Sequence, residues 1–342
     1  MWVKRFFSKK KAPAAKSYTS NSALQTIMQG WPGTPLDQDG LFMNAEYPAI
    51  MSYRSVLKFM IQRNPQRQVK KNDTWRIEVC KNDDWLSDSS DKIVWLGHAS
   101  FFIQLSGIRI LIDPIFGSLP VGKRYSALPV EPGKLLNIDY ILVSHAHYDH
   151  CDKSSIKLLT ANNPQAQILC GLKLNELLAK WTNNPIQPAG WYQQYKLKDK
   201  LNITFLPSRH WANRSLHDIN TTLWGGFMIQ MADKHIYYGG DSGYGSHFKT
   251  IGAVFPNIDV ALIGAGAYSP AWFMGQNHQD PFDAVKAFHA TGAKTFVPFH
   301  YGTFDAADEP LGEPERVLNN LHAEGKINNE LKILKLGEPF KV

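Results

Sequence analysis

Short apolar runs alternate with polar, turn-rich segments along most of the chain, and their periodicity predicts both strands and helices. Brief apolar runs bounded by Gly, Pro, Asn or Asp indicate strands, whereas apolar residues three or four positions apart indicate helices. We predict strands at 92–98, 100–105, 108–113, 140–143, 167–170, 201–206, 224–231, 235–238, 260–263 and 295–298, and helices at 50–62, 153–161, 172–180 and 281–291.

The order of these elements predicts an α/β fold. The first three strands are joined by short turns and form an antiparallel meander. Strands and helices then alternate twice, which indicates two sheets covered by helices, a four-layer αββα sandwich. Residues 1–90 are expected to form an N-terminal extension that packs on a domain of residues 91–342, and the turn-rich segment 31–39 is expected to be irregular.

One stretch, His145-Ala-His-Tyr-Asp-His150, packs four candidate metal ligands into six positions directly after a buried strand. His145 and His147 are two apart, so extended backbone projects them to the same side. Asp149 and His150 follow a turn, just before a helix that Asp152 can cap. A lone histidine is usually an ordinary surface residue, but imidazoles and a carboxylate clustered in this way suit zinc or iron.

Three further strand ends carry ligand-type residues, namely His210, Asp241 and His300. Each alone could be an ordinary turn residue, but all three follow an apolar strand through a short turn, where sheet proteins place functional residues. Together with the first cluster they give five histidines and two aspartates. That set is too large for one tetrahedral zinc and suits two metals that share a carboxylate, with iron or manganese as alternatives to zinc.

Composition is that of a soluble globular protein, with 342 residues, 44% of them hydrophobic and 20% charged. No apolar run reaches the roughly 18 residues needed to span a bilayer. The three cysteines are odd in number and widely spaced, so they predict no disulfide framework and no paired-cysteine metal site. Cys151, next to the histidine cluster, is expected to be a packed thiol rather than a ligand.

The net charge of +7 is concentrated near the start of the chain, where residues 1–16 mix lysines with Trp2, Phe6 and Phe7. No apolar core of a signal peptide follows, so we expect a cytoplasmic protein. The segment is either a basic tail or a weak anchor that places the protein peripherally on anionic lipid. Nucleic acid is not an expected partner, since nothing downstream is typical of a nucleic-acid reader.

The histidine cluster, followed in order by His210, Asp241 and His300, resembles the metallo-β-lactamase fold superfamily over about residues 91–342. Within that superfamily several stretches are similar to the family of N-acyl-phosphatidylethanolamine-hydrolysing phospholipases D and their bacterial relatives. These stretches are 31–44, 95–100, 112–116, 210–214, 223–226, 240–244, 266–274 and 299–304.

This resemblance implies two metal sites. One metal would be held by His145, His147 and His210. The other would be held by Asp149, His150 and His300, with Asp241 bridging. The resemblance also places Tyr148 and His278 at the substrate head group. His98, which follows the first strand, is expected to support the ligands by hydrogen bonding rather than to bind metal.

The expected activity is therefore that of a dizinc phosphodiesterase of the phospholipase D type, acting on N-acyl-phosphatidylethanolamine or a similar phospholipid. Asp149 or Asp241 would orient the nucleophile, and His278 would hydrogen-bond a phosphoryl oxygen or assist the leaving group. A lactonase or a soluble phosphodiesterase of the same fold is the alternative. A non-catalytic metal sensor is disfavoured by the complete seven-residue set, and a homodimer stays open.

Overall fold

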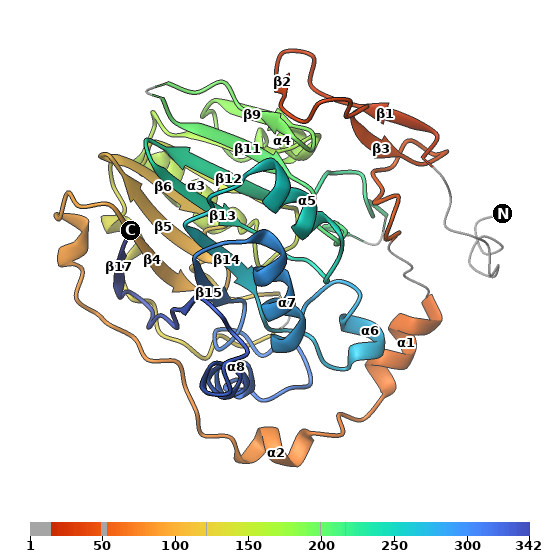
Figure 1. The fold of residues 1–342 in the computed structure, drawn as a ribbon, viewed down its shortest axis with the longest axis vertical. Coiled ribbons are helices and arrows are strands. Elements are labelled where there is room, and N and C mark those ends of the chain that lie inside the picture. Colours follow the sequence, from red (N-terminus) through yellow and green to blue (C-terminus); the bar gives the residue numbers. More distant parts are fainter. Residues whose placement is uncertain (1–14, 49–52, 121, 199, 216) are drawn as a thin grey trace.

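Two mixed β-sheets packed face to face form the centre of the computed structural model (Figure 1). The structure describes residues 15–48, 53–120, 122–198, 200–215 and 217–342. Most of the predicted basic tail and lipid anchor therefore lies outside the described residues. In the part of the chain that is described, no helix is both long and apolar enough to cross a bilayer.

The first sheet has seven strands in the order β17-β4-β5-β6-β7-β8-β9. The predicted antiparallel meander is confirmed as β4, β5 and β6, and the strands from β6 to β9 then run parallel. Every residue of β4, β5 and β7 is buried, which explains their continuous apolar character. The strands are β4 (Lys92–Gly97), β5 (Ser100–Leu105), β6 (Ile108–Ile112), β7 (Tyr140–Val143), β8 (Gln167–Gly171), β9 (Ile186–Ala189) and β17 (Pro339–Lys341).

The second sheet has eight strands in the order β16-β15-β14-β13-β12-β11-β10-β2. Its strands from β10 to β13 are antiparallel, and those from β13 to β16 are parallel. They are β2 (Gln25–Thr26), β10 (Gln193–Gln194), β11 (Asn202–Leu206), β12 (Gly226–Met231), β13 (Lys234–Tyr238), β14 (Val260–Gly264), β15 (Thr295–Phe299) and β16 (Glu330–Leu331).

Helices cover the outer faces of both sheets, so the predicted four-layer sandwich is confirmed (Figure 1). On the second sheet, α7 (Pro281–Thr291) packs on β14 and contacts α5 (His247–Val254) and α8 (Glu313–Ala323). On the first sheet, α4 (Leu174–Leu178) packs on β8 and β9, and α3 (Lys153–Asn162) precedes β8. Short 3-10 turns occur at Asp84–Leu86 and Pro132–Lys134.

Three of the four predicted helices agree closely with the structure. The carboxylate of Asp152 caps α3 by accepting a hydrogen bond from the Ser155 amide, as expected. The helix predicted at 281–291 is α7, and that at 50–62 is α1 (Tyr53–Ile61), with residues 50–52 outside the described part. The helix expected at 172–180 is shorter, because Lys173 adopts left-handed backbone with φ +65° and helical geometry begins only at Leu174.

The N-terminal segment contributes to the core of the fold as well as packing on it. β2 lies at the edge of the eight-stranded sheet and pairs with β10. β1 (Ser17–Thr19) and β3 (Thr34–Leu36) form a separate two-stranded sheet. The expectation that 31–39 is wholly irregular is therefore wrong, because β1 supplies a partner that the local pattern does not reveal. The division at residue 90 stays a prediction.

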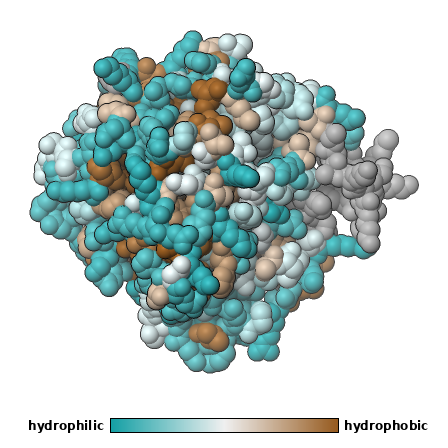
Figure 2. All heavy atoms as spheres, viewed as in Figure 1, coloured by the Kyte–Doolittle hydropathy of each residue, from teal (hydrophilic) through white to brown (hydrophobic). Residues whose placement is uncertain are grey.

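Aromatic and polar contacts join the two sheets at their centre. The hydroxyl of Tyr238, on β13, donates a hydrogen bond to Asp113 Oδ2 at 2.6 Å and lies 3.2 Å from the carbonyl oxygen of Ala99, both at strand ends of the other sheet. The rings of Phe101 and Phe299 meet edge to face at 5.5 Å. The face seen in Figure 2 is mainly hydrophilic, because the apolar residues of the strands point inward.

Candidate metal centre

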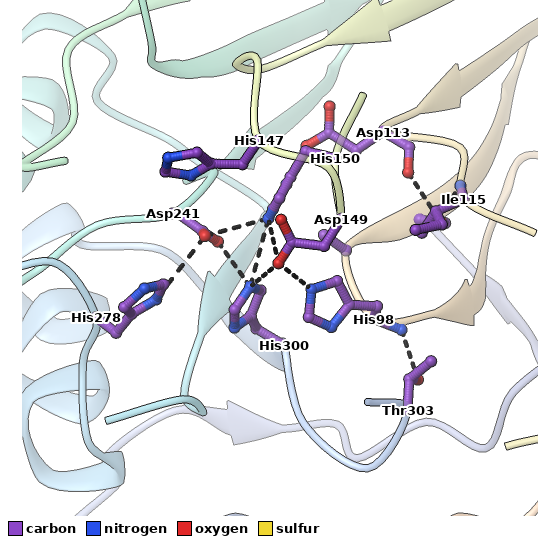
Figure 3. Close-up of polar contacts among 12 residues, drawn as sticks. His98, Asp113, Ile115, His147, Asp149, His150, Asp241, His278, His300 and Thr303 are labelled. Atoms are coloured by element: carbon purple, nitrogen blue, oxygen red, sulfur yellow. Dashed lines mark hydrogen bonds and ion pairs between the residues drawn. The ribbon is translucent and has the colours of Figure 1, made fainter. Parts of the chain in front are cut away.

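Five strands of the two sheets end at one edge and deliver polar side chains there. Within the first sheet, β4 and β7 run in the same direction, and within the second β11, β13 and β15 do so. The seven residues predicted as ligands, together with His98 and His278, are brought together at these ends (Figure 3 shows most of them). These side chains come together because strands that run in the same direction have their carboxyl ends on the same side of the sheet.

The first group contains three imidazoles that face one another. His147 Nδ1 lies 2.8 Å from His145 Nε2 and 3.1 Å from His210 Nε2. The opposite nitrogen of His210 donates a hydrogen bond to the carbonyl of Asn277, and that of His145 lies 2.9 Å from the Ser144 hydroxyl. These outer contacts place the proton of His210 on Nδ1 and leave the Nε2 lone pair directed inward, as in metal-bound histidine.

The second group lies beside the first. Nε2 of His150 is 3.4 Å from Nε2 of His300, and Asp149 Oδ2 lies 3.8 Å from each of these nitrogens (Figure 3). On its far side, His150 Nδ1 contacts Asp113 Oδ2 at 2.8 Å. Asp113 thereby fixes the ring of His150 with Nε2 pointing into the group, which is the carboxylate–histidine arrangement common behind metal ligands.

Asp241 lies between the two groups. Its Oδ2 atom is 3.1 Å from His150 Nε2 and 3.7 Å from His210 Nε2, and its Oδ1 atom is 3.1 Å from His300 Nε2. The turn that carries it depends on Gly240, which has φ +60° and whose Cβ, if present, would lie 2.5 Å from the carbonyl oxygen of Gly225. The carboxylate of Asp241 therefore contacts ligand-type histidines of both groups at once.

Protonation states of His147 and Asp241 suit cation binding, whereas at His150 the carboxylates of Asp241 and Asp149 outweigh burial and raise the pKa well above its usual value. Burial lowers the pKa of His147 to about 4, which keeps this imidazole neutral at neutral pH with a lone pair available. For Asp241, burial raises the pKa, but the neighbouring His150 and His300 outweigh it and hold the pKa well below the usual range. Asp241 Oδ1 is buried and makes no hydrogen bond in addition to its ion-pair contact with His300. The donor set of five imidazoles and two carboxylates fits two divalent metal ions.

His98 lies against the second group and makes the hydrogen bond expected of it. Its Nε2 is 2.9 Å from Asp149 Oδ2, while its backbone amide donates to Thr303 Oγ1 at 2.7 Å (Figure 3). Burial lowers the pKa of His98 to about 3, so the ring is neutral and donates from Nε2. Its backbone has φ +49°, a sparsely populated conformation for a non-glycine residue that is often found at functional sites.

Asp113 is the functional residue that sequence reasoning missed. It directly follows β6 and precedes Pro114, in a sequence that is typical of a simple turn. In the structure it is fully buried and accepts hydrogen bonds from the Ser144 amide and hydroxyl as well as from Tyr238. A signal existed, because an aspartate at the end of a buried strand next to the strand carrying the histidine cluster lies at the same sheet edge.

Tyr148 and His278, expected at the substrate, lie at the rim of the cluster. Tyr148 is 45% exposed. His278 Nδ1 is 3.8 Å from Asp241 Oδ2, and its ring stacks on that of His300 at 5.3 Å. Gly243 lets this segment approach, since a Cβ there would lie 2.3 Å from the carbonyl oxygen of Gln276. Both side chains can reach a bound molecule, and their contact with substrate stays a prediction.

Five other histidines lie outside the metal-type groups of the described residues. The three metal-type groups found among the described residues include none of His217, His235, His247, His289 and His322. Cys151 is buried, and burial raises the pKa of its thiol to about 12, so it stays protonated.

Comparison with known proteins identifies the family. Residues 108–301 match the family model described as the beta-lactamase superfamily domain, which covers more than half of the chain. The chain belongs to the metallo-β-lactamase superfamily. An N-acyl-phosphatidylethanolamine-hydrolysing phospholipase D of Caenorhabditis elegans is 33% identical over 247 residues, 68% of each chain. A metal-dependent hydrolase of Archaeoglobus fulgidus is 29% identical, covering 73% of this chain and 98% of its own.

Two solved structures share the fold of this chain. A metallo hydrolase from Ignicoccus hospitalis superposes with a TM-score of 0.55 at 21% identity, covering 74% of this chain and 98% of its own. An isothiocyanate hydrolase from Delia radicum gut bacteria gives a TM-score of 0.60 at 18% identity, covering 73% and 99%. Family membership and the named relatives make the chain a metal-dependent hydrolase.

Proposed function

We propose that the protein is a dinuclear zinc phosphodiesterase of the phospholipase D type that cleaves N-acyl-phosphatidylethanolamine or a similar phospholipid. The observation that carries the proposal is the position of Asp241, whose carboxylate lies 3.1 Å from both His150 and His300 and 3.7 Å from His210. We assign one metal to His145, His147 and His210. We assign the other to Asp149, His150 and His300, with Asp241 shared.

The choice of substrate draws on the Caenorhabditis elegans relative, which is named for hydrolysis of N-acyl-phosphatidylethanolamine. A relative from Saccharomyces cerevisiae with the same named activity is 28% identical over 254 residues. Both alignments cover about seventy percent of this chain, with 68% and 71% respectively. The proposal therefore extends the named activity of these proteins to this one.

Two zinc ions, when bound, supply Lewis acidity that lowers the pKa of water toward neutrality and offsets the charge of a phosphodiester. Asp149 and Asp241 are ionised, because nearby histidines outweigh burial and hold their pKa values well below the usual range. They can accept a hydrogen bond from the attacking water and orient it. Burial lowers the pKa of His278 to about 4, so its neutral ring can donate a hydrogen bond to a phosphoryl oxygen.

A surface beside the centre suits a lipid substrate. α1 packs against the short helix α6 (Ala271–Met274) through the stacked rings of Phe59 and Phe273, 4.5 Å apart. On this α1–α6 surface Ile61 is 76% exposed and Trp272 is 37% exposed. Exposed aliphatic and tryptophan side chains are typical of contacts with the membrane interface. Because α6 leads directly to His278, we propose that this surface rests on the bilayer while substrate enters.

A substrate panel tests the proposed activity. Zinc-loaded protein is offered N-acyl-phosphatidylethanolamine in mixed micelles, an acyl-homoserine lactone and a soluble aryl phosphodiester, with Asp241→Asn as the inactive control. We expect release of N-acylethanolamine and phosphatidic acid by the wild type alone. Lactone hydrolysis without lipid cleavage would instead favour the lactonase. Cleavage limited to the aryl phosphodiester would favour a soluble phosphodiesterase.

Vesicle sedimentation tests the lipid-facing surface separately. Ile61→Asp places a charge on the α1–α6 surface, whereas Val69→Asp on α2 (Arg67–Asn72) changes another exposed apolar residue, 61% exposed, elsewhere. We expect Ile61→Asp to lose binding to vesicles containing anionic phospholipid and Val69→Asp to retain it. Equal binding by both variants would contradict the assignment of this surface.

A further inference from the structure

One arginine spans the backbone of the segment that supplies most of the metal-type ligands. Nη1 of Arg214 donates hydrogen bonds to the carbonyl of Ala146 at 3.1 Å and to that of Cys151 at 2.7 Å. These two carbonyls flank the stretch that contains His147, Asp149 and His150. A single nitrogen therefore joins both ends of the turn and fixes its curvature.

The rest of Arg214 is held between aromatic rings. Its guanidinium lies 3.8 Å from the centre of the Tyr148 ring and 5.3 Å from that of Trp181. The Tyr148 hydroxyl in turn donates a hydrogen bond to the carbonyl of Arg214 at 3.1 Å. The Arg214 amide is itself anchored by Asp218 Oδ1 at 2.9 Å. The arginine is thus locked from both sides and holds the exposed tyrosine in one orientation.

Arg214 also belongs to the loop that begins with His210, four residues earlier. The two loops joined by the guanidinium carry the three imidazoles of the first group, since one supplies His145 and His147 and the other supplies His210. Their nitrogens face one another at 2.8 and 3.1 Å, and they must stay close together to converge on one ion. Small errors in ligand placement cost affinity steeply.

We propose that Arg214 is a positioning residue that sets the geometry of the metal-binding turn and of Tyr148 through contacts with the backbone and the aromatic rings. The proposal rests on the metal centre of the proposed function, but not on the identity of the substrate. It requires arginine in particular. Lysine keeps the charge but lacks the planar group that can stack on two rings while donating to two carbonyls.

The test compares Arg214→Lys and Arg214→Ala with Arg109→Lys in the full chain. Arg109 is a matched control, because its guanidinium also binds two carbonyls, of Leu136 at 3.1 Å and Leu86 at 2.7 Å, far from the metal centre. Zinc affinity of the metal-free proteins is measured by competition with a chromophoric chelator. The absorption spectrum of the cobalt-loaded proteins is recorded as a second readout, and thermal unfolding of the metal-free proteins as a third.

We expect Arg214→Lys to bind zinc roughly 10–100-fold more weakly than the wild type, and Arg214→Ala to bind more weakly still. The cobalt spectrum of Arg214→Lys should change in intensity, while that of Arg109→Lys should superpose on the wild type. Wild-type zinc affinity and spectrum in Arg214→Lys, with only a lower melting temperature, would overturn the proposal. Because the assay uses metal alone, failure to cleave phospholipid leaves this result unaffected.

Discussion

Asp113 Oδ2 lies 2.8 Å from Nδ1 of His150, and both side chains are completely buried. The carboxylate also accepts hydrogen bonds from Ser144 and Tyr238, so it connects the turn that carries the candidate ligands to the opposite sheet. The orientation of one ligand-type histidine is therefore set by the packing of the two sheets, not by the turn alone.

Replacing Asp113 tests this connection. Asn suits the backbone, since Asp113 has φ +41° and Asn tolerates left-handed conformations. The two carboxylate oxygens of Asp113 accept hydrogen bonds from Ser144, His150 and Tyr238. An asparagine there must place its N–H group against at least one of these donors. We expect Asp113→Asn to weaken zinc binding roughly 10–100-fold in a chelator competition assay. Tyr238→Phe removes one donor and leaves His150 in place, so it should change zinc affinity far less; equal losses would contradict the role assigned to Asp113.

The number of zinc ions bound per chain shows whether His98 supports the ligands or is itself a ligand. In His98→Asn the left-handed φ is tolerated, but the shorter side chain no longer reaches Asp149 Oδ2. We expect zinc content, measured by atomic emission after dialysis, to stay at two ions per chain while the turnover number falls roughly 10-fold or more, because Asp149 loses its hydrogen-bond donor. Loss of one zinc ion per chain would mean that His98 is itself a ligand.

Two glycines with similar backbone angles make a matched pair. Gly240 has φ +60° and a Cβ there would strike the Gly225 carbonyl at 2.5 Å, whereas Gly292 has φ +69° and open space around it. We expect Gly292→Ala to lower the free energy of unfolding by about 1 kcal/mol, from backbone strain alone. Gly240→Ala should cost more, about 3 kcal/mol or above, and displace Asp241. Equal costs in chemical denaturation would contradict the close approach seen here.

Acid sensitivity of the metal-free protein should come partly from His247, which lies outside the metal-type groups. Burial, with a smaller contribution from Arg209, lowers the pKa of His247 from 6.5 to about 3. Between these values the unfolded chain binds a proton that the folded protein does not, so stability falls as pH falls from 6.5 toward 3. This group alone should contribute roughly 1.4 kcal/mol per pH unit across that window.

The measurement for this prediction is urea unfolding in a chelator at neutral pH and at about pH 4.5. His247→Gln keeps a hydrogen-bonding group for Ser242, whose hydroxyl lies 3.1 Å from His247 Nε2, but it cannot titrate. The stability advantage of the wild type over this variant should therefore shrink on acidification. An advantage that stays constant or grows would show that His247 is protonated in the folded protein.

The strands that build the site could be predicted from sequence because their apolar character is strong and local. β4, β5 and β7 are buried along their full length, and their boundaries agree with prediction to within about a residue. The seven candidate ligands were found for a related reason, since each lies in the turn segment that follows an apolar strand. Short strands at the sheet edges, such as β2 and β16, have only two residues and carry no periodic signal.

Contacts between distant segments could not be predicted in this way. Tyr238 and Asp113 are 125 residues apart, and Arg214 and Ala146 are 68 apart. Each of these residues alone fits a strand or a turn. Only the packing of the sheets and loops shows that Asp113 supports a ligand-type histidine and that Arg214 contacts the turn that carries the candidate ligands. The residues that support the candidate ligands are therefore harder to find from one sequence than the ligands themselves.

The proposed function requires water to attack the phosphorus of a phospholipid. Zinc-loaded protein is incubated with N-acyl-phosphatidylethanolamine in water labelled with a heavy oxygen isotope, and both products are analysed by mass spectrometry. We expect one labelled oxygen in phosphatidic acid, none in N-acylethanolamine, and no turnover by Asp241→Asn. Label in N-acylethanolamine, or no cleavage by wild-type protein that holds two zinc ions, would contradict the account.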